Sequence, residues 1–304
     1  MLKKIILLCV VSFLIFILYQ NKKYPYLILN SPSQRLLNPF DTRLRYKIAD
    51  IDPRFGLSQQ EAIQLSQEAS NIWKDGTGRE YFVYDPDAKL TIHFEYDERQ
   101  STTIERLQHK QSIEHGKNVW ANKNQQINDI RIEISRANAL LESKKIELDE
   151  QLNQFNRQIA HINQNGGLHP SQQSNYAQQR QYLEQNIQAL RQEIQQYNLK
   201  INDLNTQVDE LNQLNQQLNT SVHVFNQKFQ PRMFDKGSFN GKSIHIFEFE
   251  SKDDLRLTIA HELGHALGLQ HNDDPEALMY PYMKDQNIQD FRLTYADLEL
   301  LNRK

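Results

Sequence analysis

The stretch HELGHALGLQH, residues 261–271, holds three histidines, a glutamate and a glycine at fixed spacing. His261 and His265 are four residues apart in a segment predicted to be helical, so their side chains project from one helix face. Two imidazoles at this spacing can share one tetrahedral zinc ion. Gly268 falls where the helix must end, because glycine readily takes the positive φ of a sharp turn. That turn brings His271 back as a third ligand.

Three protein ligands leave the fourth zinc position open, which is typical of a catalytic zinc site. Zinc lowers the pKa of its bound water to about 7, so a neighbouring carboxylate can remove the proton and hydroxide can attack a carbonyl group. The other interpretation is that these are unrelated surface histidines, but the glycine and third histidine stand at the required offsets. The sequence therefore predicts one catalytic Zn²⁺ held by His261, His265 and His271, with Glu262 as general base.

Two separated stretches, 43–100 and 230–304, carry the signals of a single compact α+β domain. Helices are indicated by capping residues followed by apolar residues at helical spacing, and strands by short alternating runs. The expected elements are strands at 43–48, 81–84, 90–96 and 241–249, an amphipathic helix at 59–73, the zinc-binding helix up to 267 and a closing helix from 294.

Between these stretches, residues 101–229 are rich in Gln and Asn, with apolar residues at alternating steps of three and four. Such a heptad pattern predicts a coiled coil, with one phase slip after Leu141. Gly166, Gly167 and Pro170 must break the helix, so we expect an antiparallel hairpin with arms about 90 Å long. A disordered low-complexity tract is the alternative, but it would not keep the seam in register. The seam residues are Ile127, Ile130, Ile134, Ala137, Leu141, Leu148, Leu152, Phe155, Ile159 and Ile162, then Leu183, Ile187, Leu190, Ile194, Tyr197, Ile201, Leu204, Val208 and Leu211.

The N-terminal residues 1–23 contain an apolar run, from Ile5 to Tyr19, between two pairs of lysines. We interpret this segment as an uncleaved signal anchor that crosses a membrane once, and a cleaved signal peptide with secretion is the alternative. The balanced lysines give no orientation. Residues 24–42 contain three prolines and little periodicity, and are predicted to be a linker.

The zinc motif carries a family resemblance, because HELGHALGLQH fits the metzincin pattern HExxHxxGxxH and Met279 follows at the distance of the Met-turn. The sequence ALMYP around it resembles the matrixins, the matrix-metalloprotease clan. The resemblance implies a metzincin domain with a twisted mixed sheet, interrupted here by the helical hairpin. It also implies a zinc endopeptidase.

Further roles follow only from this resemblance. Met279 would form the apolar floor beneath the metal. Tyr280, Pro281 and Tyr282 would wall the pocket for the residue after the scissile bond. The strand 244–249, with Ile244, His245 and Ile246, would be the edge along which an extended peptide lies.

The sequence also departs from the matrixin pattern. The hairpin replaces the loop that usually carries a structural zinc and calcium, so no structural zinc or calcium is predicted. The single cysteine, Cys9, lies in the N-terminal apolar run, so no cysteine-switch propeptide is expected.

Two functions remain open from sequence alone. The first is a membrane-anchored endopeptidase that cleaves extracytoplasmic proteins, in a periplasm or at a cell surface, with the hairpin binding a protein partner or a second copy. The second is a coiled-coil adaptor or scaffold with a vestigial metzincin domain. The net charge of −3 gives no reason to expect a nucleic acid partner.

Overall fold

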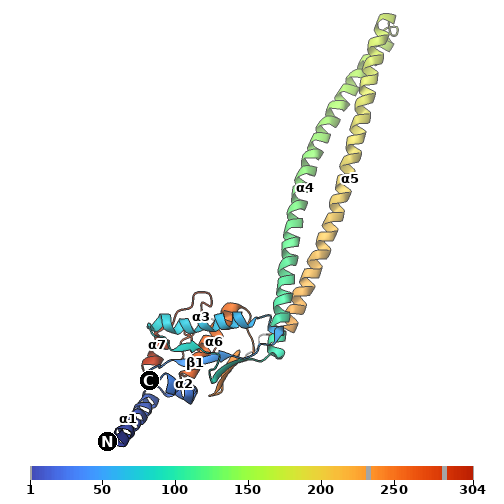
Figure 1. Cartoon of the computed structure of the whole chain (residues 1–304). Coiled ribbons are helices and arrows are strands. Elements are labelled where there is room, and N and C mark those ends of the chain that lie inside the picture. Colours follow the sequence, from blue (N-terminus) through green and yellow to red (C-terminus); the bar gives the residue numbers. More distant parts are fainter. Residues whose placement is uncertain (1, 231–233, 283–285, 304) are drawn as a thin grey trace. The chain divides into compact units, whose positions relative to one another are not determined.

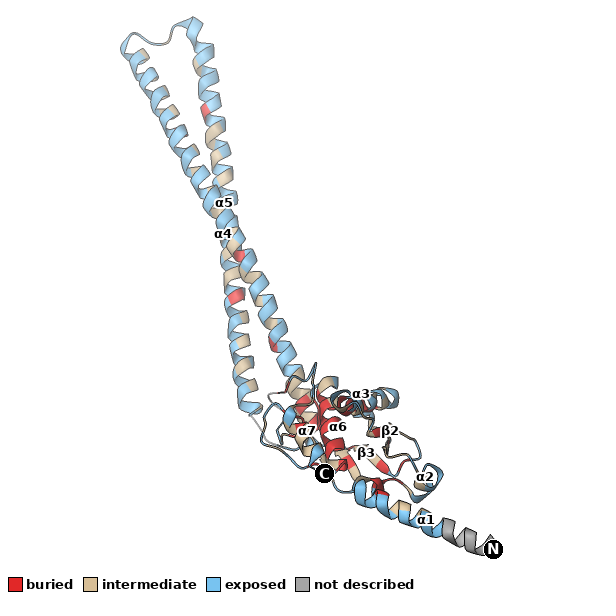
Figure 2. Cartoon of the chain, turned by 90° about the vertical axis from the view of Figure 1, so that its left-hand side faces the viewer, coloured by how far each residue is buried: buried red, intermediate tan, exposed pale blue. Residues whose placement is uncertain are grey.

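The computed structural model describes residues 2–230, 234–282 and 286–303, with side chains from Val10 onwards. The chain divides into two compact units. The first contains Met1–Gln108 and Pro231–Lys304, and the second contains His109–Gln230. Buried residues are concentrated in the first unit, whereas the helices of the second are largely exposed (Figure 2).

The first unit is built on a mixed five-stranded sheet, with one strand more than the four that the sequence predicts. The strand order is β2-β1-β3-β5-β4, and only β4 runs antiparallel to its neighbour. Alternate residues of β1 and β3 are buried, as expected for a strand with one face on the core. The strands are β1 (Leu44–Ile48), β2 (Phe82–Tyr84), β3 (Leu90–Phe94), β4 (Gly237–Phe239) and β5 (Ser243–Ile246).

Two helices, α3 (Gln59–Thr77) and α6 (Lys252–Ala266), pack against each other in the first unit (Figure 1). The predicted capping box at the start of α3 is present, with Ser58 and Glu61 exchanging hydrogen bonds. Trp73 of α3 is fully buried and donates its Nε1 hydrogen to the Ala260 carbonyl oxygen of α6 at 2.9 Å. This bond fixes α3 against the helix that carries the metal motif. The closing helix α7 spans Tyr295–Asn302.

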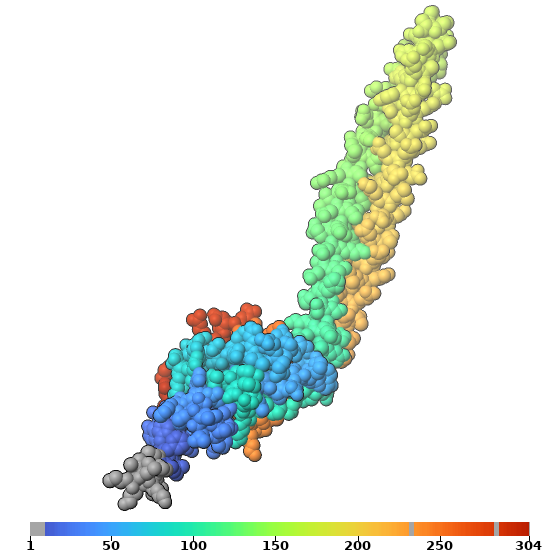
Figure 3. Space-filling view, in the orientation of Figure 1, coloured from blue at the N-terminus to red at the C-terminus, as the bar shows by residue number. Residues whose placement is uncertain are grey.

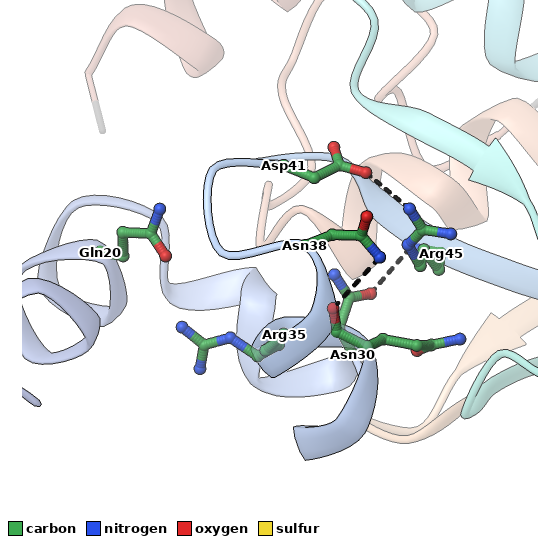
Figure 4. Close-up of a pocket in the computed structure, with 7 residues that line it drawn as sticks. Gln20, Asn30, Arg35, Asn38, Asp41 and Arg45 are labelled. Atoms are coloured by element: carbon green, nitrogen blue, oxygen red, sulfur yellow. Dashed lines mark hydrogen bonds and ion pairs between the residues drawn. The ribbon is translucent and has the colours of Figure 1, made fainter. Parts of the chain in front are cut away.

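The segment 24–42 is not a free linker, so that prediction is wrong. It forms the 3₁₀ helix η1 (Pro25–Leu29) and the helix α2 (Pro32–Leu37), and Leu27 is buried. Asn30 donates to the Arg43 carbonyl oxygen at 2.9 Å and accepts from the Arg45 amide at 2.8 Å, as a neighbouring strand would. Figure 4 shows Asn30 beside Arg45. The segment is therefore part of the first unit (Figure 3), held by side-chain hydrogen bonds that composition could not reveal.

The predicted membrane segment forms the helix α1 (Leu2–Lys23). The side chains of residues 1–9, including Cys9, lie outside the described residues. Within the part of the chain that the structure describes, no helix is both long and apolar enough to cross a membrane. A membrane span is therefore not confirmed.

The second unit consists of two long antiparallel helix arms from α4 (Glu98–Gln164) and α5 (Pro170–Lys228). Lys144 Nζ lies 2.6 Å from Glu193 Oε1, and the rings of Phe155 and Tyr176 are 6.4 Å apart. Residue numbers therefore rise along one arm where they fall along the other, so the arms are antiparallel. Every predicted seam residue is buried or partly buried except Ile194, which is 39% exposed. Supercoiling with regular knobs-into-holes packing stays a prediction.

Lys144 moves the phase slip that the apolar pattern placed after Leu141. It occupies the heptad position between Leu141 and Leu148, three residues after one and four before the other, and it is partly buried beside Glu193. The phase changes only at Leu148, which is followed by a second step of four to Leu152.

The first three turns of α4 belong to the first unit, so the boundary lies near residue 108 rather than 100. Gln100 is buried and makes two reciprocal hydrogen bonds with the main chain of Phe249, at 3.1 and 2.9 Å. Arg106 forms an ion pair with Glu250 at 2.5 Å. These contacts fix the connection between β5 and α6, which leads directly into the metal motif.

Candidate metal centre

The helix α6 is capped at its start and ends at Ala266, one residue before the end that the sequence predicts. The Ser251 side chain accepts a hydrogen bond from the Asp254 amide at 3.1 Å, which caps the first turn. At the other end Gly268 has φ 86°, and the Leu269 amide donates to the Gly264 carbonyl oxygen at 3.0 Å. This glycine turn reverses the chain, so His271 returns toward the helix.

The three predicted ligands meet at one point. The Nε2 atom of His265 lies 3.1 Å from Nε2 of His261 and 3.1 Å from Nε2 of His271, and the remaining pair is 3.2 Å apart. Three nitrogens bound to a tetrahedral zinc at about 2.0–2.1 Å stand about 3.3–3.4 Å from one another. The observed spacing therefore fits a single ion of this size.

The tautomers of two of these histidines indicate that the three nitrogens meet around a cation. His261 Nδ1 donates to the Leu278 carbonyl oxygen at 2.6 Å, and His265 Nδ1 donates to the Leu269 carbonyl oxygen at 2.8 Å. When neutral, both rings then carry a lone pair on Nε2, so these two nitrogens cannot hydrogen-bond to each other. Two lone pairs 3.1 Å apart are stabilised by a cation between them.

The environment favours the neutral imidazoles that bind metals. Burial lowers the pKa of His261 to about 4, and it also lowers the pKa of His265. His261 is buried and His265 is half-buried, whereas His271 is exposed. The site therefore opens to solvent on the His271 side.

Glu262 is buried beside the first ligand. Its Oε2 atom has no hydrogen-bond partner among the described residues. Burial, and secondarily the negative charge of Asp235, raises the pKa of Glu262 to about 8. A buried carboxylate oxygen without a partner is costly in a purely structural role, so it indicates a functional group.

A carboxylate that the sequence presents only as a helix cap organises the turn around Met279. Asp297 is fully buried and accepts hydrogen bonds from the Leu278 and Met279 amides, each at 2.9 Å. Leu278 in turn accepts the His261 Nδ1 hydrogen. The capping box that Asp297 forms with Thr294 can be predicted from sequence. The hydrogen bonds that Asp297 accepts from residues 18 and 19 positions earlier cannot.

The comparison with known families agrees with this geometry. The family model described as matrixin, of peptidase family M10, matches residues 40–303. The chain belongs to the matrixin family.

Individual matrixin relatives match over a short segment. Matrix metalloproteinase-16 of Rattus norvegicus is 47% identical over 47 residues, which is 16% of this chain and 8% of the relative. Human matrix metalloproteinase-15 is 44% identical over 46 residues (15% and 7%), and human matrix metalloproteinase-20 is 55% identical over 45 residues (15% and 9%). The match covers less than a tenth of each of these relatives.

Met279 of this matrixin is fully buried against α6, where Gly264 allows the close approach. A Cβ atom at Gly264 would overlap the Met279 sulfur and lie 2.8 Å from Cζ2 of Trp73. The glycine inside the HELGH sequence is therefore required by packing.

The predicted pocket residues lie just beyond Met279. The rings of Tyr280 and Tyr282 are 5.8 Å apart, edge to face. Tyr280 is half-buried, whereas Pro281 and Tyr282 are exposed. Residues 283–285 lie outside the described part, and the role of these side chains as a pocket wall stays a prediction.

The prediction that the strand 244–249 forms an edge of the sheet is wrong. β5 pairs with β3 on one side and β4 on the other, so Ile244, His245 and Ile246 have no free edge. Ile244 and Ile246 are fully buried, and His245 Nδ1 lies 2.6 Å from Glu95 Oε1. The edge strand on the β5 side of the sheet is β4, which is only three residues long and contains a glycine, so its sequence carries little strand signal.

Substitution of Gly264 by alanine tests the packing around the motif. Alanine normally stabilises a helix by about 1 kcal/mol relative to glycine. Here we expect the opposite sign, a loss of about 1–3 kcal/mol, because the added methyl group collides with Met279 and Trp73. Thermal unfolding with zinc analysis measures this, and a Gly264→Ala protein as stable as the wild type would contradict it.

Proposed function

We propose that this matrixin is a zinc-dependent endopeptidase with His261, His265 and His271 as metal ligands and Glu262 as the acid–base residue. The convergence of three imidazole nitrogens beside a buried, unpaired carboxylate oxygen supports this proposal. Zinc bound there would acidify a water molecule and polarise the scissile carbonyl group.

The chain's own groups perform the proton transfers. Glu262 accepts a proton from the attacking water on a carboxylate oxygen and delivers it to the amide nitrogen of the leaving group. The carboxyl group that is protonated in this first step can then act as the acid in the second step. The Nδ1 bonds of His261 and His265 hold both imidazoles in the orientation that ligation needs.

The substrate backbone would lie along β4. Lys236 accepts from the Phe247 amide, and the Asn240 amide donates to Ser243, so the intervening Gly237 and Phe239 turn their backbone groups away from β5. An extended peptide can pair with the outward backbone groups of β4, apart from the Phe239 group that hydrogen-bonds Glu262. Tyr280, Pro281 and Tyr282 would contact the residue after the scissile bond.

The adaptor hypothesis predicts a zinc site without turnover, so Glu262→Ala separates the two functions. We expect wild type and variant to bind one zinc ion each, while cleavage of an unstructured protein falls roughly 10²- to 10⁴-fold in the variant. A chelator should abolish the wild-type activity, and added zinc should restore it. Equal cleavage by both proteins, or none by zinc-loaded wild type, would favour the adaptor.

We propose an extracytoplasmic location with attachment to a membrane through α1. The motivation is the lysine-flanked apolar run and the exposed apolar side chains of Val10, Val11, Leu14, Ile15 and Leu18. Expression with an N-terminal and a C-terminal reporter, followed by fractionation, tests this. Both reporters should be found in the membrane fraction, and a protein found only in the soluble cytoplasmic fraction would contradict it.

We propose that the hairpin helices bind a protein substrate or partner. Their exposed positions are mainly amides rather than charges. The rings of His109 and Phe229 lie 5.5 Å apart, so residues 109–229 can be replaced by a short linker while Glu98–Gln108 keep their contacts. We expect small-peptide cleavage to survive and protein cleavage to fall. A rise in both would instead show that the helices shield the site.

A further inference from the structure

A nearly buried group of charges lies where β4 and α6 begin. Glu248 and Asp254 are 1% and 4% exposed. The ammonium of Lys236 lies 2.8 and 2.7 Å from the two carboxylate oxygens of Asp254, and 3.8 Å from Glu248 Oε2. Removing one member of such a pair leaves an uncompensated buried charge, so Lys236 is expected to stay in place.

The main chain of Lys236 is fixed as well. Its carbonyl oxygen accepts from the amides of Phe247 at 2.8 Å and Glu248 at 3.3 Å. Lys236 therefore joins the end of β5 through its backbone and the first turn of α6 through its side chain.

The next residue, Gly237, begins β4 and lies directly against the proposed acid–base residue. A Cβ atom at Gly237 would be 3.0 Å from both Cγ and Oε1 of Glu262, and 3.1 Å from Cγ2 of Thr258. Asp254 and Glu262 are eight residues apart on α6, which is about 12 Å along the helix. One ion pair at the start of the helix thus determines how closely β4 follows it toward Glu262.

The opposite side of the charged group is held independently. Gln100 fixes the main chain of Phe249, and Thr103 hydrogen-bonds the Glu248 side chain. With β5 and the β5–α6 connection fixed by α4, β4 is linked to α6 by Lys236 at its start and by a hydrogen bond between the Phe239 backbone and the Glu262 side chain at its end.

We propose that Lys236 is a positioning residue for the peptidase reaction: its ion pair with Asp254 holds Gly237 of β4 against Glu262. This inference rests on the proposed function. A positioning role differs from simple charge neutralisation, because it affects turnover and the conformational order of β4 even when zinc stays bound.

Lys236→Ala tests this role, with the exposed Lys242 in the turn after β4 giving the matched control Lys242→Ala. We expect Lys236→Ala to keep one zinc per chain and a similar KM, while kcat on a small peptide falls roughly ten- to a hundredfold, as for a misplaced catalytic group. Added propylamine, whose ammonium can occupy the vacated space, should restore part of kcat in this variant only.

Wild-type kcat in Lys236→Ala, or no recovery with propylamine, would overturn the proposal. If that variant does not fold, Lys236→Met with Asp254→Asn removes both charges and leaves neither unpaired. A folded double variant with lowered kcat supports positioning, and one with wild-type kcat refutes it.

Hydrogen exchange separates this inference from the proposed function. Amides of residues 234–248 should exchange faster in Lys236→Ala than in wild type or Lys242→Ala. Unchanged exchange would refute the tether. If zinc-loaded wild type cleaves no peptide, the proposed function fails, and the exchange result still decides whether Lys236 fixes β4.

Discussion

The convergence of three imidazole nitrogens within 3.2 Å of one another is the constraint on which the first unit depends. Backbone carbonyl groups hold two of these rings as tautomers whose lone pairs face each other, so the arrangement is repulsive until a cation binds between them. A fold that keeps such groups together must supply rigid support from several directions.

That support comes from parts of the chain that are distant in sequence. Asp297 fixes the turn whose Leu278 carbonyl orients His261, and Trp73 anchors α3 on the carbonyl oxygen of the residue before His261. Gly264 admits Met279 to the helix surface. At the start of the same helix, Gln100 of α4 fixes the connection from β5. The long helix α4 therefore contributes to the metal centre through its first turns, whatever its remaining length binds.

Sequence predicted the arrangement of the three histidines better than their surroundings. The helix, the glycine turn and the meeting of His261, His265 and His271 depend on local spacing, which fixes geometry over about ten residues. The mixed sheet and the matrixin family were also predicted correctly. The edge strand was misplaced because β4 has only three residues. Its pairing with β5 depends on tertiary structure, which local sequence patterns do not reveal. The segment 24–42 was misread because it is docked by long-range side-chain hydrogen bonds, such as those of Asn30 and Gln34, and by the burial of Leu27.

The most direct test of this account is X-ray absorption at the zinc edge on the purified wild-type protein, with metal content measured on the same sample. The account predicts one zinc per chain, with three imidazole nitrogens and one oxygen at about 2.0–2.1 Å. Substitution of His265 by alanine should remove one imidazole from this shell or release the metal. A protein that takes up no stoichiometric zinc, or a metal shell without imidazole scattering, would contradict it.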